Sequence, residues 1–458
     1  MTSLFSRSSS KTLSSALRPL LMAGLGLLGL AGAALPTRTA QAADAPLPAG
    51  LIEEGHYQAI LGDCAACHSQ PGRPPYSGGM PFKLPIGTIY STNISPDPVH
   101  GIGRYTEAEF ARAVQLGIRK DGSALYPAMP YPSYARLSKA DIHALYVYFQ
   151  RGVTPQPVDP PANGIIWPLS MRWPLHIWRW LFSPSIQSAQ HSTNNQFSDP
   201  VLARGAYLVE GPGHCGACHS PRSIALNEKA QTAKDGPLFL SGGGVVEQWV
   251  VPSLRQENRT GLGRWSEQDI VDFLRTGRAR TGASFGGMSP VIVHSAHAFK
   301  DDDLHAIARY LMQLAPARKE TPWVYDPTTA EKLRHADLSQ PGAQIYVDRC
   351  AACHRTDGAG YGSVFPPLAG NPVVMTDDAT SLIHIILAGD STHALHTTPS
   401  AFAMPSFADT LSDKEIADVV SFIRQSWGNN SKGVKEGAVR RIRKNLPQLE
   451  TPAQLPKN

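Results

Sequence analysis

The sequence contains one five-residue motif three times, and this motif holds the side chains best suited to chemistry. The copies are Cys64-Ala65-Ala66-Cys67-His68, Cys215-Gly216-Ala217-Cys218-His219 and Cys350-Ala351-Ala352-Cys353-His354. Two thiols on one helical turn can add across the two vinyl groups of a porphyrin, and the adjacent imidazole can then bind the iron. The motif therefore predicts covalent attachment of a c-type haem, with His68, His219 and His354 as the proximal ligands.

The cysteine count separates this interpretation from its alternatives. A single C-x-x-C pair could also be a redox dithiol or half of a zinc site. The three copies use all six cysteines of the chain, so no thiol remains to complete such a site. We therefore predict three covalently bound haem c groups, attached at Cys64, Cys67, Cys215, Cys218, Cys350 and Cys353.

A methionine follows each motif and could close the far side of the iron. Met129, Met288 and Met404 lie 61, 69 and 50 residues beyond the motif histidines, each in a predicted loop marked by proline or glycine. A thioether ligand opposite histidine raises the reduction potential relative to two histidines. We predict these three methionines as the distal ligands, so that each iron is six-coordinate.

Other side chains compete for this role. Met80 is only 12 residues beyond His68, no predicted last helix directly follows Met375, and Met312 is expected inside a helix as a core residue. A histidine could replace methionine as the distal ligand. His294 and His297 are the alternatives at the second site, and His393 and His396 are weaker alternatives at the third.

The elements that position the motifs repeat as well. A glycine and an aromatic residue precede each motif, and helices are predicted behind it at 138–150, 301–313 and 412–425. The glycine would let the first helix cross closely over the last, with the aromatic packed at that crossing. Ser138 with Asp141, and Ser412 with Glu415, have the capping-box spacing that begins a helix.

A further stretch strengthens the internal repeat. Residues 101–107 recur at 261–267, each leading into a helix that stops near a glycine, at 110–117 and 270–277, with a shorter equivalent at 381–389. Few stretches alternate as strands. The predicted fold is mostly α, with three tandem class I cytochrome c-like domains. The predicted division is a signal peptide at 1–42, domains at 43–160, 196–318 and 335–430, linkers at 161–195 and 319–334, and a basic tail at 431–458.

The first residues are typical of an exported protein. Arg7, Lys11 and Arg18 precede an uncharged apolar run, and Ala40-Gln41-Ala42 is a suitable cleavage site. A retained membrane anchor is the alternative. Because bacteria attach haem to C-x-x-C-H outside the cytoplasm, we predict a periplasmic mature chain. Beyond the leader, 38 basic residues balance 37 acidic ones, so no nucleic-acid partner is indicated.

Two stretches lie outside the repeats. Residues 165–182 hold Trp167, Trp173, Trp178 and Trp180 among arginines and prolines, which suits a docking or membrane-interface surface. The alternative is a linker packed back onto its own domains. The tail after 428 is basic and weakly amphipathic, so it could touch an anionic membrane or a partner, or be a solvated end. We expect peripheral attachment to the cytoplasmic membrane surface.

The chain resembles the trihaem cytochrome c subunits of membrane-bound periplasmic dehydrogenases, most closely those of quinohaemoprotein alcohol dehydrogenase, with sisters in gluconate, sorbitol and fructose dehydrogenases. The resemblance covers nearly all of the mature chain and is most specific at 87–94, 125–130, 171–182 and 365–371. It implies an electron-transfer subunit that is not an enzyme by itself. Electrons would come from a catalytic subunit containing pyrroloquinoline quinone (PQQ) or FAD and leave to ubiquinone. Some sisters end in a membrane helix that is not apparent here, which favours the alcohol dehydrogenase type.

Two other functions compete with this interpretation. A self-sufficient haem enzyme, such as a peroxidase or a sulfur-compound oxidase, would need one iron opened by loss of its methionine. A freely diffusing multihaem shuttle would not need the tryptophan-rich stretch.

Overall fold

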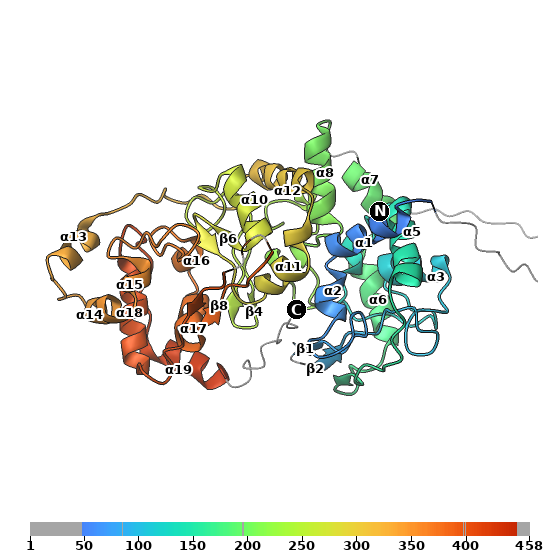
Figure 1. Cartoon of the computed structure of the whole chain (residues 1–458), viewed down its shortest axis with the longest axis horizontal. Helices are drawn as coiled ribbons and strands as arrows, with labels where there is room; N and C mark the ends of the chain where they lie inside the picture. The colour runs from blue at the N-terminus through green and yellow to red at the C-terminus, as the bar shows by residue number, and fades with distance from the viewer. Residues whose placement is uncertain (1–47, 85, 195–196, 397, 399, 447–458) are drawn as a thin grey trace, which may run out of the picture. The chain divides into compact units, whose positions relative to one another are not determined.

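The helices of the chain dominate its structure, as the sequence predicts. The computed structural model describes residues 48–84, 86–194, 197–396, 398 and 400–446, and those from Pro48 onward belong to one unit. The predicted signal peptide and residues 447–458 of the tail lie outside the described residues. Helices joined by long loops and a few very short strands make up this part of the chain (Figure 1). Among the described residues, no helix has both the length and the apolar character needed to cross a membrane.

The main helices recur in the same order in the three repeats, whereas the strands and short helices between them differ. The first repeat contains α1 (Leu51–Leu61), α2 (Cys64–His68), β1 (Pro81–Leu84), β2 (Gly87–Tyr90), α3 (Glu107–Leu116), α4 (Tyr131–Tyr134), α5 (Lys139–Val147) and the π-helical η1 (Tyr148–Gly152). The stretch after it contains β3 (Gly164–Ile165), α6 (Trp173–Phe182) and α7 (Ile186–Asn194).

The second and third repeats follow this plan. The second contains α8 (Pro200–Glu210), α9 (Gly216–His219), η2 (Ala233–Asp235), β4 (Val245–Val246), β5 (Trp249–Val250), α10 (Glu267–Thr276), β6 (Arg278–Ala279), β7 (Gly282–Ala283), α11 (Met288–His294), η3 (Ala296–Ala298) and α12 (Asp301–Gln313). The third contains α13 (Thr328–Arg334), α14 (Ala343–Arg349), α15 (Ala351–His354), α16 (Pro372–Met375), α17 (Thr380–Ala388), β8 (Asp390–Ser391), β9 (Ala403–Met404), α18 (Asp413–Gln425) and α19 (Glu436–Asn445).

Glycine lets the first helix of each repeat touch the last, as predicted. In Figure 1, α1 lies beside α5 and α8 beside α12. A Cβ atom on Gly55 would lie 2.0 Å from the carbonyl oxygen of Ala144, and one on Gly205 would lie 2.1 Å from that of Ala306. Both distances are far shorter than any real carbon–oxygen contact, so only glycine permits these crossings. Gly342 has the same position against α18.

The predicted helix limits are largely confirmed. Ser138 and Ser412 each begin a capping box, in which the serine hydroxyl accepts from the backbone N–H three residues on. The predicted helix 138–150 is divided into α5 and η1, whereas α12 and α18 agree with their predicted ranges. Helices α3 and α10 end at Gly117 and Gly277, both with positive φ, where glycine is favoured.

The strands form four small antiparallel sheets within the described residues. The largest joins β1 to β2, with Pro81 opposite Tyr90, and adds β3 through the pair Gly87 and Ile165. The others are two-residue hairpins, β4–β5, β6–β7 and β8–β9. Since β3 comes from the predicted linker 161–195, this linker is in part packed back onto the first repeat.

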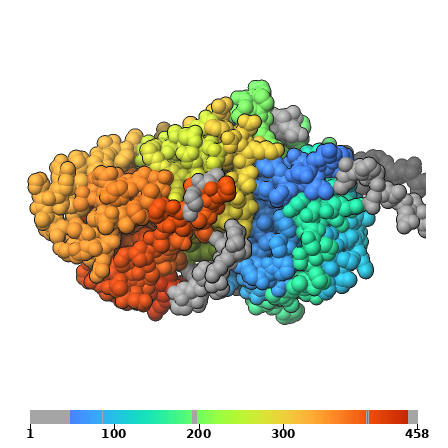
Figure 2. All heavy atoms as spheres, viewed as in Figure 1, coloured from blue at the N-terminus to red at the C-terminus, as the bar shows by residue number. Residues whose placement is uncertain are grey.

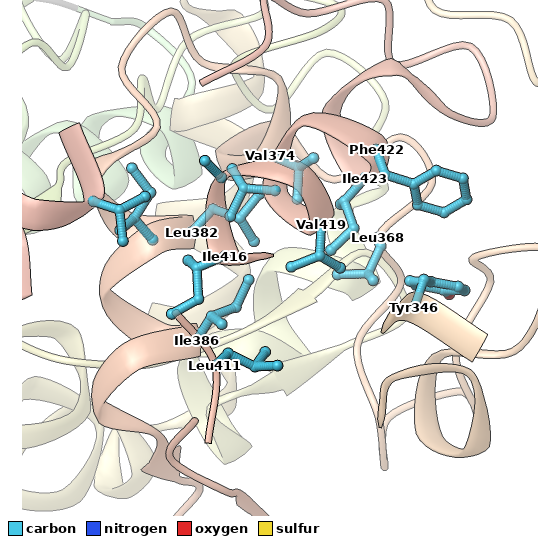
Figure 3. Packing of buried hydrophobic residues seen from close by; sticks show 14 of the residues in the cluster. Tyr346, Leu368, Val374, Leu382, Ile386, Leu411, Ile416, Val419, Phe422 and Ile423 are labelled. Atoms are coloured by element: carbon cyan, nitrogen blue, oxygen red, sulfur yellow. The ribbon is translucent and has the colours of Figure 1, made fainter. Parts of the chain in front are cut away.

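Each repeat has a hydrophobic core, and the third core is the largest. The core of the second repeat also contains Tyr57 and Leu61 of α1. Figure 3 shows Tyr346 of α14 and Phe422 of α18 in this core, with Leu382 and Ile386 of α17. Residues outside the predicted domain 335–430 also belong to it: Ala330, Leu333, Val439 and Ile442. The first part of the basic tail is therefore a helix, α19, whose apolar side is covered. In Figure 2 the red C-terminal residues adjoin the orange residues of the same repeat.

A tyrosine from each of the first two repeats forms a hydrogen bond with the last helix of the other repeat. The Tyr57 hydroxyl of α1 donates to Asp303 of α12 at 2.7 Å, and the Tyr207 hydroxyl of α8 donates to Asp141 of α5. The sequence predicted that each aromatic packs at the helix crossing of its own repeat. In the structure the two tyrosine hydroxyls instead bind the last helix of the neighbouring repeat. In the third repeat, Tyr346 does pack on its own last helix, 5.3 Å from the Phe422 ring centre. The reciprocal bonds join the first two repeats through equivalent positions.

Candidate haem-binding sites

The three motif histidines have the same environment. Nδ1 of His68 lies 2.7 Å from the carbonyl oxygen of Thr92, that of His219 lies 2.8 Å from Pro252, and that of His354 lies 2.9 Å from Pro366. A carbonyl can only accept, so Nδ1 carries the proton and Nε2 keeps its lone pair for a metal. Burial lowers the pKa of all three imidazoles, against the opposing effect of this hydrogen bond, and so favours the neutral ligand form.

The cysteines do not resemble reactive thiols. Burial raises the pKa of Cys64 and Cys215 to about 12, whereas thiolates used in catalysis or thiol exchange have a lowered pKa. All six are free cysteines, and the described residues contain no group of three or more histidine, cysteine or acidic side chains able to hold a metal ion. The donors at each motif are thus two thiols and one oriented imidazole, which is the set that covalent haem attachment requires.

A cavity of about 2580 Å³ connects the three motifs. It is much larger than the roughly 300–1,000 Å³ of a typical single-ligand pocket. In the second repeat the indole Nε1 of Trp265 and the hydroxyl of Thr281 line it, and both atoms are buried without a hydrogen-bond partner. Haem has carboxylate side chains, which such donors could bind. The residues present therefore fit the group. The cavity lining includes the predicted haem-binding residues Cys64, Cys67, His68, Met129, Cys215, Cys218, His219, Met288, Cys350, Cys353, His354 and Met404.

The three predicted distal methionines reach the cavity from different elements. Met129 lies in the turn before α4, and Met404 lies on β9. Met288 is the first residue of α11, where the sequence suggested a loop. Pro290, in the first turn of α11, is the signal that could have revealed this helix, because proline is tolerated there. All three methionines precede the last helix of their repeat.

Some of the alternative distal ligands line the cavity and others do not. Met80, His294 and His393 also line the cavity. Met375 is 4% exposed, belongs to the core side of α16 and does not line the cavity. Nδ1 of His297 donates to the carbonyl of Ile292 at 3.0 Å, and His297 also does not line the cavity.

The first and second sites meet on their cysteine sides. The ring of His214, directly before Cys215, lies 5.7 Å from that of Tyr134, whose hydroxyl donates to the carbonyl of Gly62. Burial lowers the pKa of His214 to about 4, so it is a neutral core residue. Burial, then Asp63 and then Cys218, raise the pKa of Cys67 to about 12, which agrees with the proximity of the two motifs. Sequence spacing alone contained no signal for this contact.

The tryptophan-rich stretch has one packed and one exposed side. Arg172 donates to the carbonyl of Ala124 at 3.0 Å, and the Trp178 indole donates to that of Ala225 at 2.8 Å. In contrast, Trp167, Trp173 and Trp180 are 80%, 62% and 78% exposed. The stretch is therefore in part packed back onto its own chain, and the docking or membrane-interface interpretation of its exposed tryptophans stays a prediction.

Comparison with known proteins agrees with this geometry. The family model for cytochrome c matches residues 339–427, which contain the third motif and Met404. The chain is thus a c-type cytochrome with covalently bound haem c.

Relatives that match most of the chain define its family more closely. The cytochrome c subunit of alcohol dehydrogenase (quinone) of Gluconacetobacter polyoxogenes is 54% identical over 89% of this chain and 86% of its own length. The gluconate 2-dehydrogenase cytochrome c subunit of Pantoea cypripedii is 50% identical over 83% and 87%. The Gluconobacter oxydans alcohol dehydrogenase subunit is 48% identical over 90% and 84%. The chain belongs to this family of dehydrogenase cytochrome c subunits, which transfer electrons and are not the catalytic chains.

Proposed function

We propose that the chain binds three haem c groups, one at each C-x-x-C-H motif, with the axial pairs His68 and Met129, His219 and Met288, and His354 and Met404. The observation that carries this proposal is that all three motif histidines have the same hydrogen bond, from Nδ1 to a backbone carbonyl. Bound haem c supplies a one-electron iron couple. The chain itself orients each imidazole and brings a thioether to the same cavity.

Haem counting tests this proposal directly. The purified mature protein should contain three haems per chain in an alkaline pyridine assay, and replacing Cys218 by alanine should lower covalent haem without affecting the other motifs. Ferric protein should also show the far-red sulfur-to-iron absorption of methionine ligation. Fewer than three haems in the unaltered protein, or no such absorption, would contradict the proposal.

We further propose that the chain passes electrons from a catalytic dehydrogenase subunit, containing PQQ or FAD, to ubiquinone. Relatives named as cytochrome subunits of alcohol, gluconate and fructose dehydrogenases support a dehydrogenase partner. Three sites that share one cavity supply a route for electrons through the chain. Co-purification with the catalytic subunit and ubiquinone reduction by the reconstituted complex are expected. Rapid carbon monoxide binding to the isolated chain would instead indicate an open iron and favour a self-sufficient haem enzyme.

We propose that this electron transfer takes place in the periplasm at the cytoplasmic membrane surface, after cleavage of residues 1–42. The exposed face of α6 and the residues before it suit peripheral attachment, since exposed tryptophans favour the interface between lipid and water. No acidic residue occurs between 160 and 198, whereas Arg172 and Arg179 do, so anionic lipid is the better match.

Binding to vesicles tests this attachment. Replacing Trp167, Trp173 and Trp180 together by serine should reduce sedimentation with vesicles of anionic phospholipid. The matched control replaces Trp323, which lies in a different linker. Equal binding of the triple variant and the unaltered protein would show that another surface makes the contact.

A further inference from the structure

The second and third repeats meet at a cluster of aromatic side chains that borders the cavity. Trp249 of β5 belongs to the second repeat, and its ring centre lies 4.7 Å from that of His384 on α17 of the third repeat, in an edge-to-face arrangement. On its other side Trp249 stacks on Phe285, at 6.5 Å. The backbone N–H of Val250 donates to the hydroxyl of Ser381 at 2.7 Å. All five residues line the cavity that holds the motifs.

Hydrogen bonds connect the two distal segments at the same place. The N–H of Gly286, two residues before Met288, donates to the carboxylate of Asp390 at 3.1 Å. Asp390 is in turn the strand partner of Met404. A short path of covalent and hydrogen bonds therefore runs from one predicted distal methionine to the other. We name Trp249, Phe285, Gly286, His384 and Asp390 the distal junction.

His384 has a polar atom that nothing in the chain satisfies. The side chain is 6% exposed, and its Nδ1 has no hydrogen-bond partner. Leaving a buried polar atom unpaired costs about 1–3 kcal/mol. His384 also lines the cavity, so this unpaired polar side chain lies at the border of the two sites.

We propose that the distal junction couples the second and third haem sites and sets the rate at which an electron moves between them. This inference rests on the proposed presence of three haems. One electron leaves a ferrous iron at one site and reduces a ferric iron at the other, with no bond or proton changed. Trp249 and His384 act as positioning residues, because they fix the two sites against each other and fill the space between them.

Electron redistribution in the three-haem protein tests the proposal. A short light pulse that generates a reductant delivers less than one electron per ferric chain, and absorbance then follows its redistribution. Replacing Trp249 by leucine should slow one phase about tenfold, which corresponds to about 1.4 kcal/mol of barrier, and leave the other phases unchanged. His384→Leu should slow the same phase, and Trp249→Phe should restore most of the rate.

Trp323→Leu is the matched control. Trp323 also bridges the two repeats, because its N–H bonds to Asn258 and its ring borders Gly370, but it does not line the cavity. Equal slowing by the Trp323 and Trp249 variants, or no slowing by Trp249→Leu with three haems bound, would overturn the distal junction. Fewer than three haems in the unaltered chain would instead refute the proposed function.

Discussion

The carboxylate of Asp303 holds the first two repeats together, so replacing it tests this contact directly. It is 5% exposed and accepts from Tyr57 at 2.7 Å, and from Nε and a terminal nitrogen of Arg204 at 2.7 and 2.8 Å. Burial raises the pKa of Asp303, but the bonds from Arg204 and Tyr57 outweigh it, so the pKa lies below its usual value. The ionised form therefore stabilises the folded chain.

The expected effect of Asp303→Asn follows from these three bonds. A hydrogen bond to a charged group contributes roughly 1.5–3 kcal/mol. The asparagine oxygen can still accept one bond, and the Arg204 side chain is 36% exposed, so water replaces part of what it loses. We expect a loss of about 2–3 kcal/mol in the free energy of unfolding, or roughly 30- to 150-fold in the unfolding constant.

Urea unfolding of the haem-loaded protein, followed by tryptophan fluorescence, measures this loss. Asp302→Asn is the matched control, because Asp302 is exposed on the same helical turn and should change stability by less than about 0.5 kcal/mol. A lowered pKa stabilises above the unfolded value of about 3.9, and this stabilisation is lost as the pH falls through the folded pKa. The gap between Asp303→Asn and the unaltered protein should therefore close in acid. Equal midpoints at neutral pH, or a gap that persists in acid, would refute the role given to this carboxylate.

Three further predictions concern the helices and one proposed axial ligand. Gly205→Ala should destabilise the second repeat by about 1–3 kcal/mol in urea unfolding, because its Cβ has no room, whereas Gly437→Ala, with nothing within 4 Å, should not. Ser412→Ala removes the cap of α18 and should cost about 1 kcal/mol by the same measurement; a loss below about 0.3 kcal/mol would contradict the cap's role. Met404→Ala should keep three covalent haems, lose part of the far-red sulfur-to-iron absorption and bind carbon monoxide at one site. Unchanged absorption would assign the third distal ligand elsewhere.

Much of the fold could be predicted because its signals are local. Capping boxes at Ser138 and Ser412, and terminal glycines such as Gly117 and Gly277, depend on neighbouring residues only, and the helices begin or end there. The glycines at the helix crossings were recognisable because the pattern occurs three times. The motif histidines could also be predicted, since the residues that define their role are five consecutive ones.

The contacts between repeats could not be predicted in this way. Tyr57 and Tyr207 precede their motifs as expected, but which helix each hydroxyl reaches depends on how the repeats dock. The tail offers a second example: Val439 and Ile442 have the spacing of an amphipathic helix, yet only the third core shows what covers them. His384 gave no local signal, because its partner Trp249 is 135 residues away in the sequence.

The second repeat meets its two neighbours at two different places, the distal junction and a junction with the first repeat. The cysteine side of the second site meets the first repeat, through His214 and Tyr134, and the segment around Met288 meets the third repeat, through Gly286 and Asp390. A side chain replaced at one junction therefore leaves the other intact, so the two exchange steps can be altered separately. If electrons pass from the first site to the third through the second, both junctions lie on their path. Slowing at either junction should then slow transfer through the whole chain.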